Sequence, residues 1–266
     1  MKIVVCVKQV PEVTNVQVDP VTGTLIREGV RSILNPFCEY ALDHAVRLAA
    51  ANPEVEVIAI TMGPPQARDV LLRSMELGAD RGILVTDRKF AGADTWATAI
   101  TLANAIRAAV PDFDLILTGK QAIDGDTAQV GPEIAEILAL PQVTYGVEAA
   151  LTPDRRKIRV RREAERGYET IEALLPALVT FSKGEVVRRV PSLSELIASR
   201  EKPVDVVSAN DLNIPEEELG LKGSFTQVVK VFPPVEKQGG KMLANADSQA
   251  AAQEILTFLR EKRFLS

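Results

Sequence analysis

The stretch from residue 114 to residue 132 reads Asp-Leu-Ile-Leu-Thr-Gly-Lys-Gln-Ala-Ile-Asp-Gly-Asp-Thr-Ala-Gln-Val-Gly-Pro. Its first part, Asp114–Gly119, is a short apolar run that predicts a buried strand. A helix is expected over Thr127–Leu140, and the loop between the two is rich in Gly and Asp. A strand that leads through a loop into a helix is the repeating unit of an α/β sheet.

The same alternation of apolar runs and helical patterns extends along most of the chain. Helices of about 10–15 residues between strands predict a parallel sheet. We therefore expect an α/β fold in which helices cover both faces of a parallel sheet. Further strands are expected at Lys2–Val7, Val55–Met62, Gly82–Thr86 and Ala177–Ser182, and further helices at Cys38–Ala51, Ala67–Leu77 and Asp94–Val110.

Two regions depart from this pattern. Residues Arg156–Arg162 and Tyr168–Leu174 alternate charged and apolar side chains around a turn, which predicts an antiparallel hairpin at or beyond the edge of the sheet. Towards the C-terminus, prolines punctuate a stretch with one clear helix, Asp247–Lys262. The apolar residues of this stretch favour packing on another protein over disorder. We therefore divide the chain into a domain, residues 1–190, and an arm, residues 191–266.

Composition excludes several classes of protein. Charged residues make up 25% of the 266 residues, and the net charge is −5. This balance argues against binding to nucleic acid or to anionic membranes, which requires a basic face. No apolar run approaches the roughly 20 residues of a transmembrane helix, and the N-terminus reads as a strand, not a signal peptide. The two cysteines, Cys6 and Cys38, make no disulfide framework, so a cytoplasmic protein is expected.

The loop after Gly119 is the strongest candidate for a binding site. Ligands of open parallel sheets bind at the carboxyl ends of the strands, and a loop entering a helix offers backbone N–H groups to a phosphate. Gly119 and Gly125 permit close approach and positive φ. Thr127 could cap the helix or donate to a phosphate, whereas Asp124 and Asp126 would orient amides or hold a ribose hydroxyl. The alternative is an ordinary turn with a threonine cap.

Other segments are weaker candidates. Gly92–Thr95 is either a capped helix start that leaves room for a ligand, or simply a helix start with Asp94 as its N-cap. Leu34–Cys38 is either a third ligand segment or a turn punctuated by proline. The single histidine, His44, lies inside a predicted helix, so a catalytic triad or a histidine-rich metal site is not expected. A nucleotide site without an acid, base or nucleophile implies that reactivity belongs to a cofactor.

Seven short segments, taken together and in order, carry a family resemblance. They are Val7–Pro11, Asn35–Cys38, Thr61–Pro64, Leu77–Arg81, Gly119–Asp124, Pro176–Thr180 and Arg189–Ile197. With them, the chain resembles the beta subunit of electron-transfer flavoproteins over essentially its whole length. The resemblance implies a Rossmann-related, adenine-nucleotide alpha-hydrolase-like fold and an alpha subunit as partner, on which the arm packs. It also implies that Leu193 anchors a recognition loop that docks onto partner dehydrogenases.

The resemblance also implies which residues contact the nucleotide. They lie at the ends of the first two strands expected in the chain, at the start of the first helix, and along the glycine-rich loop. These residues are Cys6, Asn35, Pro36, Phe37, Cys38, Met62, Lys120, Gln121, Ala122, Ile123, Asp124, Gly125, Asp126, Thr127, Ala128, Gln129, Val130 and Gly131.

This family has two branches. In one, the beta subunit holds AMP as a structural ligand and docks dehydrogenases. In the other it holds a second FAD, which takes a hydride from NADH and splits the electron pair between a high-potential acceptor and a ferredoxin or flavodoxin. The high-potential acceptor would be an acyl-CoA or other dehydrogenase, or a quinone reductase. Two segments resemble the bifurcating branch: one contains Gly92, Ala93, Asp94, Thr95 and Thr98, and the other is Asp124–Glu133. Small residues and hydroxyls in these segments would leave room for a flavin ring.

Two features point the other way. Asn35–Cys38 is closer to the AMP branch, and Trp96 is bulky beside the expected ring. A third possibility is a stand-alone adenine-nucleotide-binding protein or PP-loop ATPase on the same fold. The sequence lacks the Ser-Gly-Gly-x-Asp-Ser loop of such an ATPase, and that alternative leaves the arm unexplained.

Overall fold

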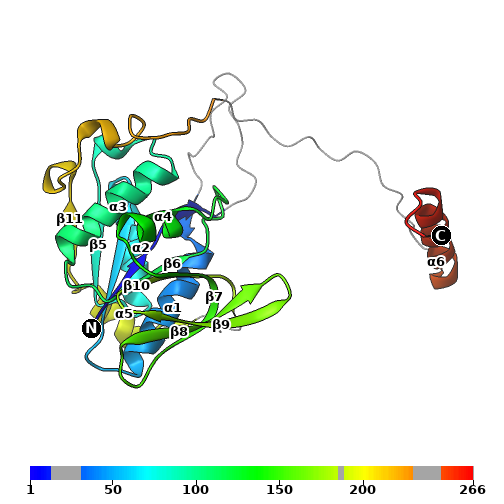
Figure 1. Ribbon diagram of the computed structural model, residues 1–266, viewed down its shortest axis with the longest axis horizontal. Coiled ribbons are helices and arrows are strands. Elements are labelled where there is room, and N and C mark those ends of the chain that lie inside the picture. Colours follow the sequence, from blue (N-terminus) through cyan, green and yellow to red (C-terminus); the bar gives the residue numbers. More distant parts are fainter. Residues whose placement is uncertain (13–30, 185–188, 230–246, 266) are drawn as a thin grey trace. The chain divides into compact units, whose positions relative to one another are not determined.

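The central sheet of the protein contains nine strands in the order β11-β5-β4-β1-β6-β10-β7-β8-β9 (Figure 1). The first seven in this order run parallel, and β8 and β9 are antiparallel additions at one edge. The strands are β1 Lys2–Cys6, β4 Glu56–Met62, β5 Arg81–Val85, β6 Leu115–Gly119, β7 Gln142–Leu151, β8 Lys157–Ala164, β9 Gly167–Leu174, β10 Ala177–Phe181 and β11 Val204–Val207. A small separate sheet pairs β2 Gln9–Pro11 with β3 Ser32–Leu34.

Helices cover both faces of the large sheet. Along β1, Ile3 and Val5 belong to one core cluster, whereas Val4 and Cys6 belong to another. The first cluster includes residues of α1 and α2, and the second includes residues of α3 and α4, so each pleat of the strand faces a helix layer. The helices are α1 Pro36–Ala50, α2 Arg68–Glu76, α3 Thr95–Ala109, α4 Val130–Ile137, α5 Leu193–Ser199 and α6 Ser248–Glu261, with 3-10 turns η1 Pro65–Ala67, η2 Arg88–Phe90, η3 Ala209–Asp211 and η4 Glu216–Glu218.

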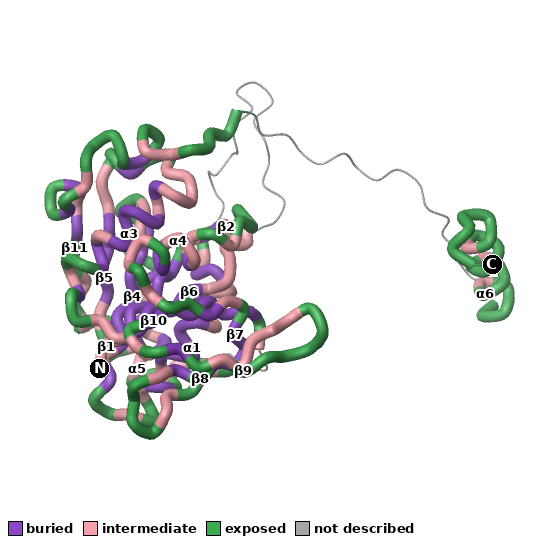
Figure 2. Tube along the Cα trace, in the orientation of Figure 1, coloured by how far each residue is buried: buried purple, intermediate pink, exposed green. Residues whose placement is uncertain are grey.

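The computed structural model describes residues 1–12, 31–184, 189–229 and 247–265. It divides into two compact units, Met1–Lys230 and Val231–Ser266. In the first unit, buried positions concentrate on the central strands (Figure 2). The described part of the second unit is dominated by α6, which Asp247 caps and in which no residue is buried. None of the described helices combines the length and apolarity needed to cross a membrane.

The structure confirms the predicted α/β class, the parallel sheet and the hairpin, which is β8 and β9. It adds β7, β11 and α5, which the sequence pattern did not reveal. The described residues 191–229 of the predicted arm fall in the first unit, in which β11 pairs with β5. The packing of the arm on an alpha subunit stays a prediction.

Candidate functional site

The predicted ligand residues of the first strand, the first helix and the loop after β6 lie at the carboxyl ends of the central parallel strands. Cys6 ends β1 and is in register with Thr118 of β6, and Met62 ends the neighbouring β4. The start of α1 approaches the end of β6 so closely that a Cβ on Gly119 would lie 2.6 Å from the carbonyl carbon of Phe37. Glycine at position 119 is therefore needed for the packing of α1 against the end of β6, and close approach of a phosphate to Gly119 stays a prediction.

Asn35 joins the start of α1 to the loop. Its side chain is buried (1% exposed). The Asn35 Nδ2 amide donates to the carbonyl of Gln121 at 2.9 Å, and its Oδ1 accepts from the N–H of Ile123 at 3.2 Å. The same amide donates to Cys38 Sγ at 3.2 Å, and Pro36 occupies the first turn of the helix. One amide therefore fixes the position of the loop relative to α1.

The two loop aspartates are paired within the protein. Asp124 forms an ion pair with Lys8 at 2.8 Å, and Gln121 Nε2 donates to Asp126 Oδ1 at 2.6 Å. The carbonyl of Ala122 accepts from the N–H groups of Gly125 and Asp126, which makes the loop a tight turn. Neither carboxylate is therefore free to face a phosphate without giving up a partner.

The backbone of this loop differs from prediction in two respects. Positive φ occurs at Asp126 (50°) and Ala128 (55°), whereas Gly119 and Gly125, which would permit it, do not adopt it. Aspartate tolerates the left-handed region because its short polar side chain can bond locally. Thr127 does not cap the helix, because α4 begins three residues later, at Val130.

The helix start nevertheless offers donors. Among the described residues, no acceptor faces the backbone N–H groups of residues 127–131. Helix α4 also lies close to the sheet, since a Cβ on Gly131 would be 2.7 Å from Thr180 Cγ2 and 2.8 Å from Thr118 Oγ1. Free N–H groups beside the positive end of a helix dipole form an anion-binding surface.

The second predicted segment meets the same loop. Asp94 caps α3 by accepting from the N–H of Ala97 at 3.0 Å, which confirms its expected capping role. Thr95 Oγ1 lies 3.2 Å from Gln129 Oε1 and 3.1 Å from Glu133 Oε1. The segment 92–98, which includes Gly92, Ala93 and Thr98, thus adjoins the start of α4. The two helices meet although α3 follows β5 and α4 follows β6.

Glu133 adjoins these segments, although it is not among the predicted ligand residues. Burial raises the pKa of its carboxyl, the Asp94 charge adds to this effect, and the hydrogen bond from Thr95 opposes it. Its Oε2 atom is buried without a hydrogen-bond partner among the described residues. Its position one helical turn after Gln129 was the available signal, because residues at this spacing share a helix face.

One lysine and two cysteines also lie near the carboxyl ends of these strands. The Lys120 ammonium lies 5.2 Å from the centre of the Phe37 ring and 5.5 Å from that of Tyr145, a favourable cation–π geometry. Both cysteines are free and buried. Burial raises the pKa of the Cys6 thiol to about 12, and burial likewise raises the pKa of Cys38. Neutral buried thiols act here as small apolar side chains.

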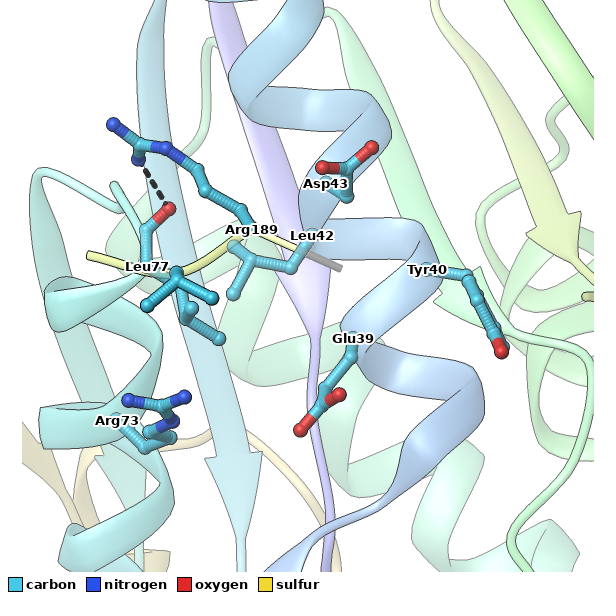
Figure 3. A pocket seen from close by; sticks show the side chains of 8 residues that line it. Glu39, Tyr40, Leu42, Asp43, Arg73, Leu77 and Arg189 are labelled. Carbon is cyan, nitrogen blue, oxygen red and sulfur yellow. Dashed lines mark hydrogen bonds between the residues drawn. The ribbon is translucent and has the colours of Figure 1, made fainter. Parts of the chain in front are cut away.

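Leu193 lies in a segment near the amino ends of the parallel strands, away from the carboxyl ends where the predicted ligand residues lie. It is the first residue of α5 and is 73% exposed. The preceding Arg189 donates to the carbonyl of Leu77 at 2.6 Å, and Leu77 precedes the amino end of β5. Arg189 also borders a cavity of about 160 Å³ between α1 and α2 (Figure 3). That cavity is lined by none of the predicted nucleotide residues.

A family model for the electron transfer flavoprotein domain matches residues 22–212. The chain belongs to the electron transfer flavoprotein family. It is 45% identical over the full length of both chains to the caffeyl-CoA reductase-Etf complex subunit CarD of Acetobacterium woodii. It is 44% identical, again over both full lengths, to the electron transfer flavoprotein subunit beta of Clostridium acetobutylicum. Protein FixA of Rhizobium meliloti is 45% identical over 90% of this chain and 83% of its own.

Within the electron transfer flavoprotein family, the chain is a beta subunit. Beta subunits of this family pair with an alpha subunit. The contacts of the predicted residues with a nucleotide, and of Leu193 with a partner, stay predictions.

Proposed function

We propose that this beta subunit, together with its alpha subunit, holds an FAD that accepts a hydride from NADH, after which one electron passes to a high-potential acceptor and the other to a ferredoxin or flavodoxin. The observation that carries the proposal is the contact of Thr95 with Gln129 and Glu133, at 3.2 and 3.1 Å. This contact brings the segment 92–98 beside the end of the loop 120–131 and supports the two segments serving as two walls of one site. AMP needs the second wall for its phosphate, whereas a dinucleotide with a ring system could use both.

The residues fit such a group. The unpartnered N–H groups of residues 127–131 supply donors for a pyrophosphate at the start of α4. Gly125 leaves open space, because a Cβ there would meet nothing within 4 Å. Lys120 adds a positive charge beside the loop. FAD, when bound, supplies the redox chemistry, and the residues of the chain bind it, orient it and set the polarity around it.

The second candidate is AMP as a structural ligand, with the chain acting as a binding and docking module. It is favoured by Asn35 and Cys38, whose polar atoms bond to one another and to the loop. Both N–H groups of the Asn35 side-chain amide are used in these bonds, so this side chain has no spare donor for a flavin ring. The predicted electron acceptors, a dehydrogenase or quinone reductase, are common to both candidates.

Counting flavins decides between the candidates. The two subunits are co-purified, denatured, and assayed for released FAD and AMP. We expect two FAD per heterodimer and bleaching of the flavin absorbance by NADH. One FAD with one AMP, and no bleaching by NADH, would overturn the proposal in favour of the AMP carrier.

A further inference from the structure

Residues 219–226, which we call the strap, lie across the start of α3. The N–H of Leu221 donates to the carbonyl of Ala91 at 3.0 Å. Contact at Gly92 is close, because a Cβ there would lie 3.2 Å from Leu221 Cβ. Gly220 approaches more closely still, since its Cβ would lie 2.2 Å from the carbonyl oxygen of Lys89. The strap is therefore seated on the backbone of residues 89–92.

The strap is bonded chiefly to Asp94. Ser224 Oγ accepts from the N–H of Asp94 at 2.9 Å. Asp94 Oδ2 accepts from the N–H of Thr226 at 2.9 Å and from its hydroxyl at 3.1 Å. The other carboxylate oxygen, Oδ1, caps α3. One side chain thus fixes the helix start with one oxygen and the strap with the other.

The charge of Asp94 suits this role. Burial acts to raise the pKa of its carboxyl, but hydrogen bonds from the backbone of Ala97 and from the backbone and hydroxyl of Thr226 outweigh that effect and lower the pKa. The carboxylate therefore stays ionised at neutral pH, and hydrogen bonds to an ionised acceptor are the stronger kind. A ring contact adds to them, because Phe225 stacks on Trp96 with centroids 5.7 Å apart.

Thr95 stands between the two residues that the strap contacts. It follows Asp94, precedes Trp96, and makes the contact with Gln129 and Glu133 that joins the two walls of the site. The contacts of Asp94 and Trp96 restrain the backbone on both sides of Thr95, and the β-branched side chain of a threonine has few rotamers in a helix.

We infer that the strap is a positioning element of the nucleotide site: Ser224 and Thr226, acting through Asp94, hold Thr95 where the walls formed by α3 and α4 meet. The inference rests on one part of the proposed function, namely that the site binds a nucleotide, either FAD or AMP. The strap residues act through their bonds to Asp94.

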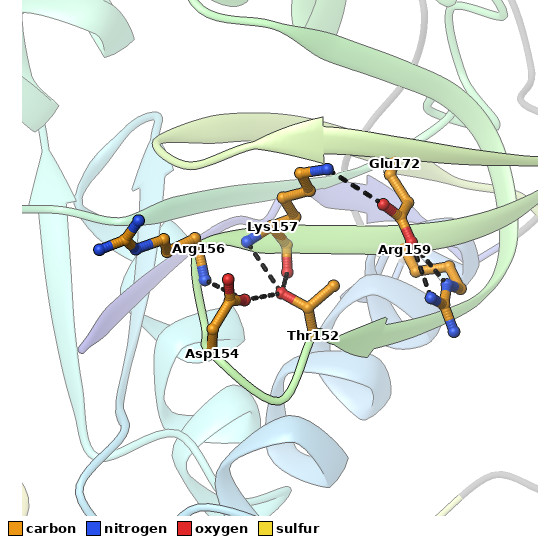
Figure 4. A network of polar contacts seen from close by, with 6 residues as sticks. All are labelled: Thr152, Asp154, Arg156, Lys157, Arg159 and Glu172. Atoms are coloured by element: carbon orange, nitrogen blue, oxygen red, sulfur yellow. Dashed lines mark hydrogen bonds and ion pairs between the residues drawn. The ribbon is translucent and has the colours of Figure 1, made fainter.

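The test uses the complete heterodimer carrying Thr226→Val, Thr226→Ser or Thr152→Val. Thr152 is the matched control, because its hydroxyl also bonds an aspartate, Asp154 at 2.6 Å, and a backbone N–H, that of Lys157 at 3.1 Å (Figure 4). Its turn lies at the far edge of the sheet, since the carbonyl of Arg156 accepts from the N–H of Leu175 just before β10. The measurements are the Kd of the depleted complex for FAD and for AMP, and its thermal midpoint.

We expect Thr226→Val to raise the Kd for the nucleotide about tenfold, since it removes a bond to an ionised group. Thr226→Ser keeps the hydroxyl and should restore the wild-type Kd. Thr152→Val should leave the Kd unchanged even where its thermal midpoint falls as far as that of Thr226→Val. If Thr226→Val does not assemble, Ser224→Ala serves in its place and should raise the Kd by a smaller factor.

A spectroscopic readout separates positioning from general destabilisation. Trp96 is the only tryptophan of the chain, so a complex with 5-fluorotryptophan in this subunit gives one ¹⁹F resonance from it, assigned by its loss in Trp96→Phe. That resonance should move in Thr226→Val and stay in place in Thr152→Val. Equal Kd values for these two variants would overturn the inference. If the wild-type complex holds AMP, the proposed function fails, while the strap is still judged from the Kd for AMP.

Discussion

His44 shows what burial does to a single titratable residue. Its ring is 6% exposed and stacks on Phe181 with centroids 4.1 Å apart. Burial lowers the pKa of His44 to about 4, with a contribution from the Arg47 charge, while a hydrogen bond to the backbone of Val147 opposes the shift. The ring is therefore neutral in the folded protein at physiological pH, and its Nε2 atom has no partner among the described residues.

His44 predicts a loss of stability on acidification. In the unfolded chain a histidine binds its proton near pH 6.5, whereas in the folded chain it does so only near pH 4. Between these values the unfolded state binds more protons, so the free energy of unfolding falls as the pH falls, by roughly 3 kcal/mol in total. Urea unfolding of wild type and His44→Phe at several pH values measures this, and the variant should show the shallower dependence. Equal dependence in both proteins would exclude His44 as the source.

Leu193 makes a prediction about docking. Its side chain is exposed at the first position of α5, where the Ser192–Glu195 capping box fixes the helix start. If it anchors a partner dehydrogenase, Leu193→Ala should lower the second-order rate constant of electron transfer about tenfold. Nucleotide content should not change. Leu174→Ala is the control, because Leu174 is also exposed (60%) but lies on β9; a similar loss in that variant would argue against a specific anchor.

At the scale of elements, the sequence predicts the strands that are buried on both faces of the sheet. Central strands such as β4 and β10 are continuous apolar runs, so their positions were predictable from the sequence. Strand β11 was missed because it is short, lies at an edge and exposes two of its four residues. Strand β7 was missed because buried and exposed positions alternate irregularly along it. Tertiary pairing, which no local pattern contains, determines both strands.

The candidate site was partly predictable for a related reason. The ligand segments follow strands in the sequence, and parallel strands bring such segments to one edge, so their convergence could be expected. The contacts among them could not. Asn35 binding the loop, Thr95 reaching Glu133, and the strap over Asp94 depend on side-chain directions fixed only by packing.

The packing of α4 makes the element-scale prediction. Gly131→Ala would place a methyl group 2.7 Å from Thr180 Cγ2 and 2.8 Å from Thr118 Oγ1, so either α4 or these buried threonine side chains must shift. We expect a loss of about 1–3 kcal/mol in the free energy of unfolding, with weaker nucleotide binding. Gly125→Ala is the control, since its Cβ would meet nothing within 4 Å. Urea titration of both variants checks this, and an unchanged midpoint for Gly131→Ala would contradict it.

At the scale of the whole molecule, the two units differ in how they are stabilised. Every buried hydrophobic residue of the described chain lies at or before Leu219. Helix α6 has no buried residue, yet Ile255, Leu256 and Phe258 are exposed along it. An exposed apolar helix face of this kind is typical of a segment that completes its packing on another chain, which supports the proposal that the arm binds the alpha subunit.

Substitutions on α6 test that proposal. Ile255→Ser combined with Phe258→Ser should reduce the amount of alpha subunit that co-purifies, because the apolar face is lost. The thermal midpoint of the first unit should stay the same. Thr257→Val, on the same helix, is the control, since Thr257 bonds only the carbonyl of Gln253 among the described residues. Unchanged recovery of the alpha subunit with the double variant would contradict the proposal.

The pairing of β11 with β5 has a consequence for how the protein is made. Arg81 and Asp205, which form an ion pair across these strands, are 124 positions apart in the chain. A ribosome adding about 5–20 residues per second needs about 6–25 s to travel that distance. Throughout that interval, the nascent sheet presents the unpaired amides and carbonyls of β5 as a template for any other extended chain. Because the four residues of β11 are synthesised late, this subunit is most exposed to misassembly during translation and not after its fold is complete.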